Sequence, residues 1–169
     1  MFSGVDHRSP VGLYGIQQLD VLGPQTTMNW ATITTIVIPD QPVAMSRARV
    51  SKYGAYYPTK IKRAIADNTK RIQAIVQSDG LDRLDEPIKL ICTYVCSRPS
   101  RLRSAKSPEG RIRKTTKPDL DNYLKMTMDC LTKGGLWVDD NRVCEIEASK
   151  YYANKHEEPH TLIQVQVLR

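Results

Sequence analysis

The chain has 169 residues, of which 40% are hydrophobic and 25% are charged, and its formal net charge is +7 at neutral pH. This length and apolar fraction suit one domain with one ordinary core. There is no run of about 18 apolar residues and no basic region followed by an apolar block near the start, so we expect neither a membrane span nor a signal peptide. We therefore expect a cytoplasmic protein. The basic balance favours a polyanionic partner without identifying it.

The cysteines and histidines do not suggest a metal or disulfide scaffold. No two cysteines form the CxxC pair that zinc ribbons need, and the three histidines lie near the two ends of the chain. We therefore expect the cysteines to be small buried hydrophobic residues: Cys92, Cys96, Cys130 and Cys144.

The N-terminal part divides into an extension and the start of a domain. Residues 1–29 are rich in Gly, Pro, Ser and Gln without a hydrophobic period, which predicts an extension outside a domain spanning 30–169. The β-branched run at 32–38 predicts a strand that ends at Pro39. The next stretch interleaves tyrosines with Arg47, Arg49 and Lys52, which favours contacts with a phosphate backbone, although a solvated loop with tyrosines anchored in the core fits equally well.

The rest of the chain predicts two helices and several strands. Apolar residues at helical spacing predict a helix from Thr59 to Gly80, and the nearly continuous apolar run 88–97 predicts a strand covered on both faces. The stripe Leu120, Leu124, Met128 and Leu131 predicts a second helix, followed by strands at 136–138, 143–152 and 162–168. The predicted class is α/β (α+β), a single small domain with a mixed β-sheet flanked by two main helices.

Between the middle strand and the second helix lies a basic segment, residues 98–117. It holds eight cations and one acid, an excess of eight minus one, or +7, equal to that of the whole chain. Its Ser, Pro and Gly content offers little to bury, so we expect a mobile loop that binds DNA, with a solvated surface loop as the alternative. The cations are Arg98, Arg101, Arg103, Lys106, Arg111, Arg113, Lys114 and Lys117.

Three acids follow this segment. Pro118 favours an extended entry into the helix, which places Asp119 near its cap and Asp121 in its first turn. Alone, these acids are explained as helix-start charges that contribute about 1 kcal/mol each. Asp140, after a short strand, can point back toward the same helix end, and three convergent carboxylates suit Mg²⁺, or alternatively Mn²⁺.

Lys125 lies one turn after Asp121 and one turn before Asp129. A surface ladder of ion pairs explains this spacing. A functional interpretation places the ammonium beside a metal-bound phosphate, where it neutralises developing charge.

The run from Lys117 to Val143 resembles the RusA family of Holliday-junction resolvases. The resemblance rests on Asp119-Leu120-Asp121-Asn122, then Lys125, Asp129 and Leu131, and then Leu136-Trp137-Val138-Asp139-Asp140 and Val143. It is weaker from about Ile36 to Tyr57, and residues 1–29 have no counterpart. Tyr123 stands where the family commonly has an aliphatic residue, and the basic segment looks longer than in compact members, which leaves junction selectivity open.

The resemblance implies roles for single residues. Asp119, Asp121 and Asp140 would be the catalytic metal-binding acids, Lys125 the essential lysine, and Asn122 and Asp139 supporting residues. It also implies a homodimer that cuts four-way DNA junctions with Mg²⁺, often encoded by phages, prophages or mobile elements. Two other classes stay open: a junction-binding architectural protein that does not cut, and a metal phosphohydrolase acting on nucleotides.

Overall fold

A computed structural model describes residues 28–169, so almost all of the predicted extension lies outside the described residues. The elements are β1 (Trp30–Pro39), β2 (Arg49–Ser51), β3 (Gly54–Tyr56), α1 (Thr59–Ser78), β4 (Ile88–Cys96), η1 (Ser100–Leu102, a 3-10 turn), β5 (Ile112–Arg113), α2 (Leu120–Lys133), η2 (Asp140–Arg142, a 3-10 turn), β6 (Val143–Tyr152) and β7 (His160–Leu168). None of the helices within this range is long and apolar enough to cross a membrane.

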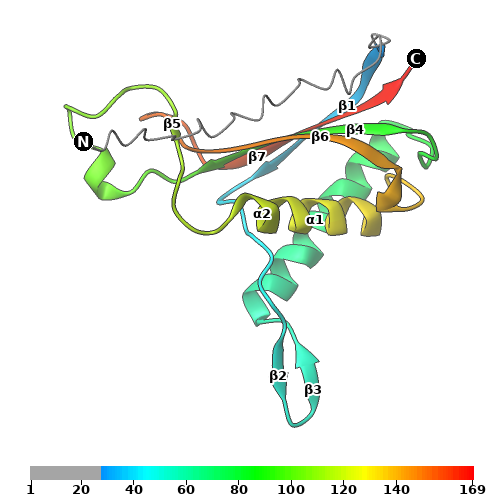
Figure 1. The fold of residues 1–169 in the computed structure, drawn as a ribbon, viewed down its shortest axis with the longest axis horizontal. Helices are drawn as coiled ribbons and strands as arrows, with labels where there is room; N and C mark the ends of the chain where they lie inside the picture. The colour runs from blue at the N-terminus through cyan, green and yellow to red at the C-terminus, as the bar shows by residue number, and fades with distance from the viewer. Residues whose placement is uncertain (1–27) are drawn as a thin grey trace, which may run out of the picture.

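Five strands form one sheet in the order β1-β7-β4-β6-β5. The β4–β6 pair is parallel and the other pairs are antiparallel, which confirms the predicted mixed sheet in an α+β domain. Both helices lie on the same face of the sheet (Figure 1). The central strand β4 therefore buries Leu90 and Cys92 under the helices. On its other face Val95 is buried, whereas Ile91 and Thr93 are only partly buried, so within residues 28–169 the cover of this face is less complete than predicted.

The buried face of α2 differs from the predicted leucine stripe. Tyr123, Met126 and Cys130 are buried, and Leu124 and Met128 are only half-buried. Tyr123 stacks on Tyr94 of β4, with ring centroids 5.0 Å apart, so this aromatic residue is a packing element of the core. Leu120 is also only partly buried, so the helix is rotated such that three of its four predicted core positions lie nearer the surface.

The two helices approach closely at the end of α2. A Cβ atom at Gly134 would lie 2.5 Å from the Cγ2 atom of Ile72, which is fully buried in α1. Only glycine fits such a separation without movement of the neighbouring helix, so Gly134 lets α1 and α2 pack together beneath the sheet.

No strand forms at 136–138. Trp137 makes one isolated bridge with Leu84, in which the Leu84 amide donates to the Leu136 carbonyl and the Val138 amide donates to the Leu84 carbonyl. Trp137 is fully buried, and its indole nitrogen donates to Thr132 Oγ1 at 2.7 Å. This bridge, instead of a sheet strand, holds the chain as it enters η2.

Three cysteines fit the predicted role as buried hydrophobic residues. Cys92, Cys96 and Cys130 are buried, and burial raises the pKa of Cys92 to about 12 and that of Cys130 to about 11, so both are neutral thiols at physiological pH. Cys144, the second residue of β6, is exposed, so the prediction that it is buried is wrong.

Candidate metal centre and nucleic-acid interface

Asp119 and Asp121 stand at the N-terminal end of α2, as predicted. Asp119 is the N-cap residue with extended backbone, but its side chain makes no capping hydrogen bond. Asp121 lies in the first turn, is exposed, and accepts a hydrogen bond from Asn122 Nδ2 at 3.3 Å. Because the Asp119 side chain does not cap the helix, the structure does not support the explanation that this residue serves only as a helix cap.

Asp139 and Asp140 have different positions in the η2 turn. The side chain of Asp139 accepts a hydrogen bond from the Asn141 amide at 2.9 Å and so caps the turn. Asp140 is exposed as the first residue of the turn, and η2 contacts α2. Asp139 therefore stabilises the turn that presents Asp140, which agrees with its predicted supporting position.

One shallow pocket of about 310 Å³ brings several predicted residues together. Asp121 and Lys125 of α2 line it with Asp140 of η2, so residues 19 positions apart in the sequence share one surface. Its other lining residues are Leu124, Met128 and Asp129. Asp119 does not line this pocket, and Asp129, which the sequence placed only in a ladder of charges, does.

The carboxylate oxygens of the pocket suit a hard cation such as Mg²⁺, but the three predicted acids do not come together around one position. Within residues 28–169, no group of three or more His, Cys, Asp or Glu side chains is arranged to hold a metal ion. Mg²⁺ commonly takes only one or two carboxylates and fills its shell with water and substrate phosphate. Asp121 and Asp140 are therefore suited to hold such an ion, and the expected convergence of Asp119 with them is not seen.

Lys125 is free of the ion-pair ladder that its spacing suggested. None of the ion pairs formed inside the described part of the chain includes Lys125, although Arg63 and Asp67 of α1 do pair at the same spacing. The Lys125 ammonium therefore lines the pocket without a carboxylate partner among these residues. Such an ammonium is available to an incoming phosphate.

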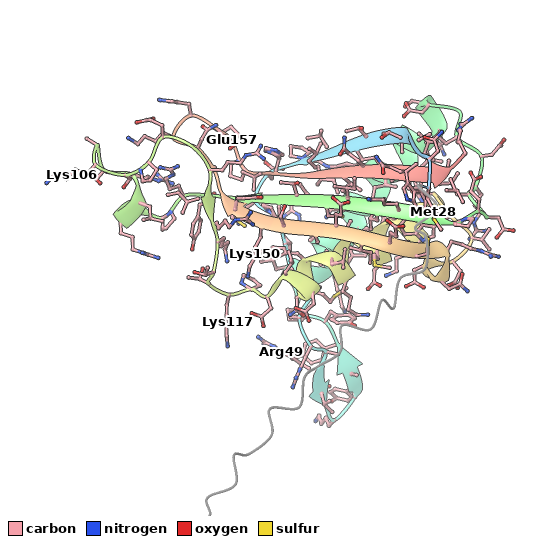
Figure 2. All side chains as sticks on the ribbon, turned by 45° about the horizontal axis from the view of Figure 1, so that its top comes forward. Met28, Arg49, Lys106, Lys117, Lys150 and Glu157 are labelled. Carbon is pink, nitrogen blue, oxygen red and sulfur yellow. The ribbon has the colours of Figure 1, made fainter. Side chains whose placement is uncertain are left out.

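Two lysines hold the backbone that leads into Asp119. Lys114 Nζ donates to the carbonyls of Thr116 (2.7 Å) and Lys117 (2.5 Å), and Lys150 Nζ donates to those of Thr116 (3.1 Å) and Pro118 (2.7 Å). Figure 2 shows Lys150 of β6 beside the segment that carries Lys117. Sequence reasoning missed Lys150, because no local pattern links a strand lysine to a carbonyl 32 residues earlier.

Lys114 is itself buried, at 7% exposure, so its predicted contact with DNA is wrong. Its charge instead balances carbonyl dipoles inside the protein.

Arg98 is the second predicted DNA contact that the structure contradicts. It is 4% exposed, and all five of its N–H groups donate to backbone carbonyls. The acceptors are Ala153 (2.9 Å), Leu102 (3.2 Å), Pro108 (2.7 Å), Glu109 (3.3 Å) and Gly110 (2.6 Å). The basic segment is therefore folded around this guanidinium, although most of its residues are exposed, as expected.

Other cations of the segment are also engaged by the protein. Arg111 makes a two-pronged ion pair with Glu157, whose pKa the Arg111 hydrogen bonds lower. Arg103 Nε donates to the Arg98 carbonyl at 2.7 Å, and the guanidinium carbon of Arg113 lies 5.6 Å from the centre of the Tyr151 ring. These contacts leave their outer N–H groups to solvent but fix their positions.

Several exposed cations that were predicted to contact DNA form no ion pair within residues 28–169, among them Arg47, Arg49, Lys52, Arg101, Lys106 and Lys117. In Figure 2, Arg49 and Lys117 lie on the same side of the molecule, near the start of α2, whereas Lys106 lies at the far end of the basic segment. Exposed positive charge is therefore present both beside the start of α2 and at the outer end of the basic segment.

Comparison with known proteins gives two similarities. The model of the family described as Endodeoxyribonuclease RusA matches residues 39–166, most of the chain. The chain is also similar to the uncharacterized protein YqaN of Bacillus subtilis (strain 168), with 36% identity over 67 residues, or 40% of this chain and 44% of YqaN. The match thus covers less than half of the length of YqaN, and the name of that protein states no activity.

Proposed function

Because the chain belongs to the RusA family of endodeoxyribonucleases, we propose that it is a Mg²⁺-dependent nuclease that cuts four-way DNA junctions in recombination and repair. The observation that carries this proposal is the pocket shared by Asp121, Asp140 and Lys125. It combines carboxylates with a lysine that makes no ion pair inside the described residues, beside the N-terminal end of a helix, where anions are favoured.

Each residue of the pocket has a distinct role in this proposal. Asp121 and Asp140 would hold Mg²⁺, and Mn²⁺ is the natural substitute for such oxygen ligands. The bound ion would supply Lewis-acid stabilisation of the phosphate and an activated water. Lys125 would donate to a phosphate oxygen and stabilise the charge that develops as the 3′ oxygen leaves.

Asp119 would act from the end of the helix. Its side chain is exposed and makes no capping hydrogen bond, one residue before the first turn, so it would act on the ion through a water molecule. Lys114 and Lys150 would keep this end of the helix in place by holding the preceding carbonyls.

The DNA would lie across the exposed cations on both sides of the pocket. Arg49 and Lys117 are close to the start of α2 and suit phosphates next to the cut, whereas Lys106 suits a more distant part of a duplex arm. A homodimer with two-fold symmetry would present the same surface to two strands of opposite polarity, as paired cuts across a junction require.

An architectural protein that binds junctions without cutting is the competing function. It would explain the cations, but the exposed acids among them would weaken phosphate binding unless a metal ion bridges the two. A nucleotide phosphohydrolase is less well supported, because the pocket is shallow and cations extend far beyond it.

The deciding experiment compares a synthetic four-way junction with a linear duplex of the same sequence, each incubated with Mg²⁺ or with EDTA. We expect paired cuts in the junction with Mg²⁺ only. Asp121→Asn should abolish cutting, and Asp67→Asn, the same change at an exposed acid of α1, should not. Junction binding without cutting under every metal condition would favour the architectural function.

A further inference from the structure

The β2–β3 hairpin is a separate two-stranded element that projects from the body of the protein (Figure 1). Its pairing places Ser51 opposite Gly54, so Lys52 and Tyr53 form the turn at its tip. Ser51 Oγ accepts a hydrogen bond from the Tyr53 amide and donates one to the Gly54 carbonyl, both at 3.2 Å, and Gly54 supplies the positive φ of 112°. The tip is therefore a formed turn.

The tip carries apolar surface that no part of residues 28–169 covers. Tyr53 is 88% exposed and Val50 is 84% exposed, the two highest values among the large hydrophobic residues. Isolated exposed apolar side chains are common on proteins, but here two of them lie within four residues at the end of a projecting element. No packing contact within residues 28–169 requires an aromatic residue at this position.

The charge around the tip indicates the chemistry of its partner. Residues 46–57 contain three cations and no acid, and the Lys52 ammonium lies 4.9 Å from the centre of the Tyr53 ring. An aromatic ring among cations is the combination that binds nucleic acid bases by stacking while the cations hold the backbone. A second copy of the same hairpin would instead meet like charges.

The base of the hairpin is fastened to the candidate metal site. Met45 is 6% exposed, and its amide donates to the carbonyl of Asn122 at 2.8 Å, next to Asp121. Eight residues lead from Met45 to Tyr53, so the tip lies within about 29 Å of this anchor even if the chain is fully extended. A base held by Tyr53 and a phosphate at the pocket would thus fit on one bound junction.

We propose that Tyr53 stacks on a base that is exposed at the centre of branched DNA, and that the hairpin thereby directs the junction centre to the metal site. This inference rests on the proposed function, because it assumes branched DNA as the substrate. Intact duplex offers no free base face along its length, so the contact would favour junctions over linear DNA. Arg49 and Lys52 would contribute phosphate contacts to both forms.

The test measures binding of junction and linear duplex by variants in an Asp121→Asn background, which prevents cutting. Tyr53→Ala should weaken junction binding roughly 5- to 150-fold, the range for loss of one stacked base, and leave duplex binding unchanged. Tyr53→Trp should retain junction binding. Lys52→Gln is the charge control and should weaken both substrates equally, with a salt dependence flatter by about one unit.

A second measurement follows the bases themselves. Permanganate oxidises thymines that are unstacked, and binding of the Asp121→Asn protein should change the reactivity of thymines at the branch point. The same change in reactivity with Tyr53→Ala would overturn the inference, as would equal weakening of junction and duplex binding by this variant. Circular dichroism of each variant verifies that the fold is kept, which we expect for such exposed positions.

The outcomes separate the inference from the function on which it rests. If the protein with intact Tyr53 does not prefer junctions to duplex, the proposed substrate is wrong and the inference falls with it. If that preference exists and Tyr53→Ala keeps it, only the inference is wrong. A shift from dimer to monomer in Tyr53→Ala without DNA would assign the tip to a second copy of the chain and also overturn the inference.

Discussion

The ammonium nitrogen of Lys150 lies 2.7 Å from the carbonyl oxygen of Pro118, the residue before Asp119. Lys150 belongs to β6, within the sheet, and Pro118 ends the basic segment, so this contact connects the rigid core to the start of α2. The same ammonium reaches the Thr116 carbonyl, which also accepts from Lys114. The position of Asp119 therefore depends on two cations whose ammonium groups hold the carbonyls that precede it.

Lys150→Met should weaken the metal site without unfolding the protein. Loss of two charge-assisted hydrogen bonds at a partly exposed position should lower the free energy of unfolding by about 1 kcal/mol. The Mg²⁺ concentration for half-maximal cutting should rise, whereas junction binding in EDTA should hold. Lys150→Arg should restore most of the metal response because it keeps the donors, and an unchanged Mg²⁺ response in Lys150→Met would show that the contact does not position Asp119.

Asp121→Asn should abolish cutting and leave junction binding intact or tighter. The change removes one candidate metal ligand and one negative charge near the phosphates. Rate measurements at saturating enzyme and gel-shift binding in the absence of metal distinguish the two effects. Near wild-type cutting would mean that Asp121 is only a favourable charge at the start of α2.

Lys125→Ala should lose turnover with little change in stability. The side chain is exposed and makes no ion pair within residues 28–169, so its removal should change the free energy of unfolding by about 0.5 kcal/mol or less. Single-turnover cutting and thermal unfolding of the same preparation measure both. A large fall in melting temperature with normal specific activity would assign Lys125 to structure.

The cations of the basic segment should separate into structural and DNA-binding groups. Arg98→Met removes the guanidinium donor from five carbonyls, of which that of Glu109 keeps the Lys155 amide as a second donor, and should destabilise the protein by about 3 kcal/mol. The triple change of Arg101, Lys106 and Lys117 to Ser should leave stability intact and flatten the salt dependence of junction binding by about three units of log K per log salt. An unchanged slope would place the DNA on Arg47, Arg49 and Lys52 instead.

The Arg111–Glu157 pair should make the docking of the basic segment sensitive to acid. Hydrogen bonding to Arg111 lowers the pKa of Glu157 in the folded state, so the pair stabilises the protein above the ordinary glutamate pKa of about 4.3 and loses this effect as pH falls through the lowered value. The urea midpoint of Glu157→Gln should therefore lie below wild type at pH 7 and approach it near pH 3. Glu86→Gln, an exposed change, should show no such convergence.

The sequence alone was sufficient for the elements with strong local signals. The β-branched run of β1, the helical spacing of α1 and α2, and the alternation in β7 each predicted an element that the structure contains, although the buried face of α2 is rotated from the predicted stripe. The family was also readable from the motif between Lys117 and Val143, because it combines acids, a lysine and core residues at set spacings. The positions of Asp121 and Asp140 beside Lys125 agree with that motif.

Tertiary structure decided what the charged side chains contact. Arg98 and Lys114 look like any other cation of the basic segment in the sequence, yet they are buried against backbone carbonyls that folding brings to them. Lys150 and Met45 act on α2 through contacts from 32 and 77 residues away, and the strand expected at 136–138 became a single bridge with Leu84. The sequence does not show which group a cation contacts, because every residue has a backbone carbonyl that can accept a hydrogen bond. Only the folded structure determines which carbonyls lie within reach of a guanidinium or ammonium group.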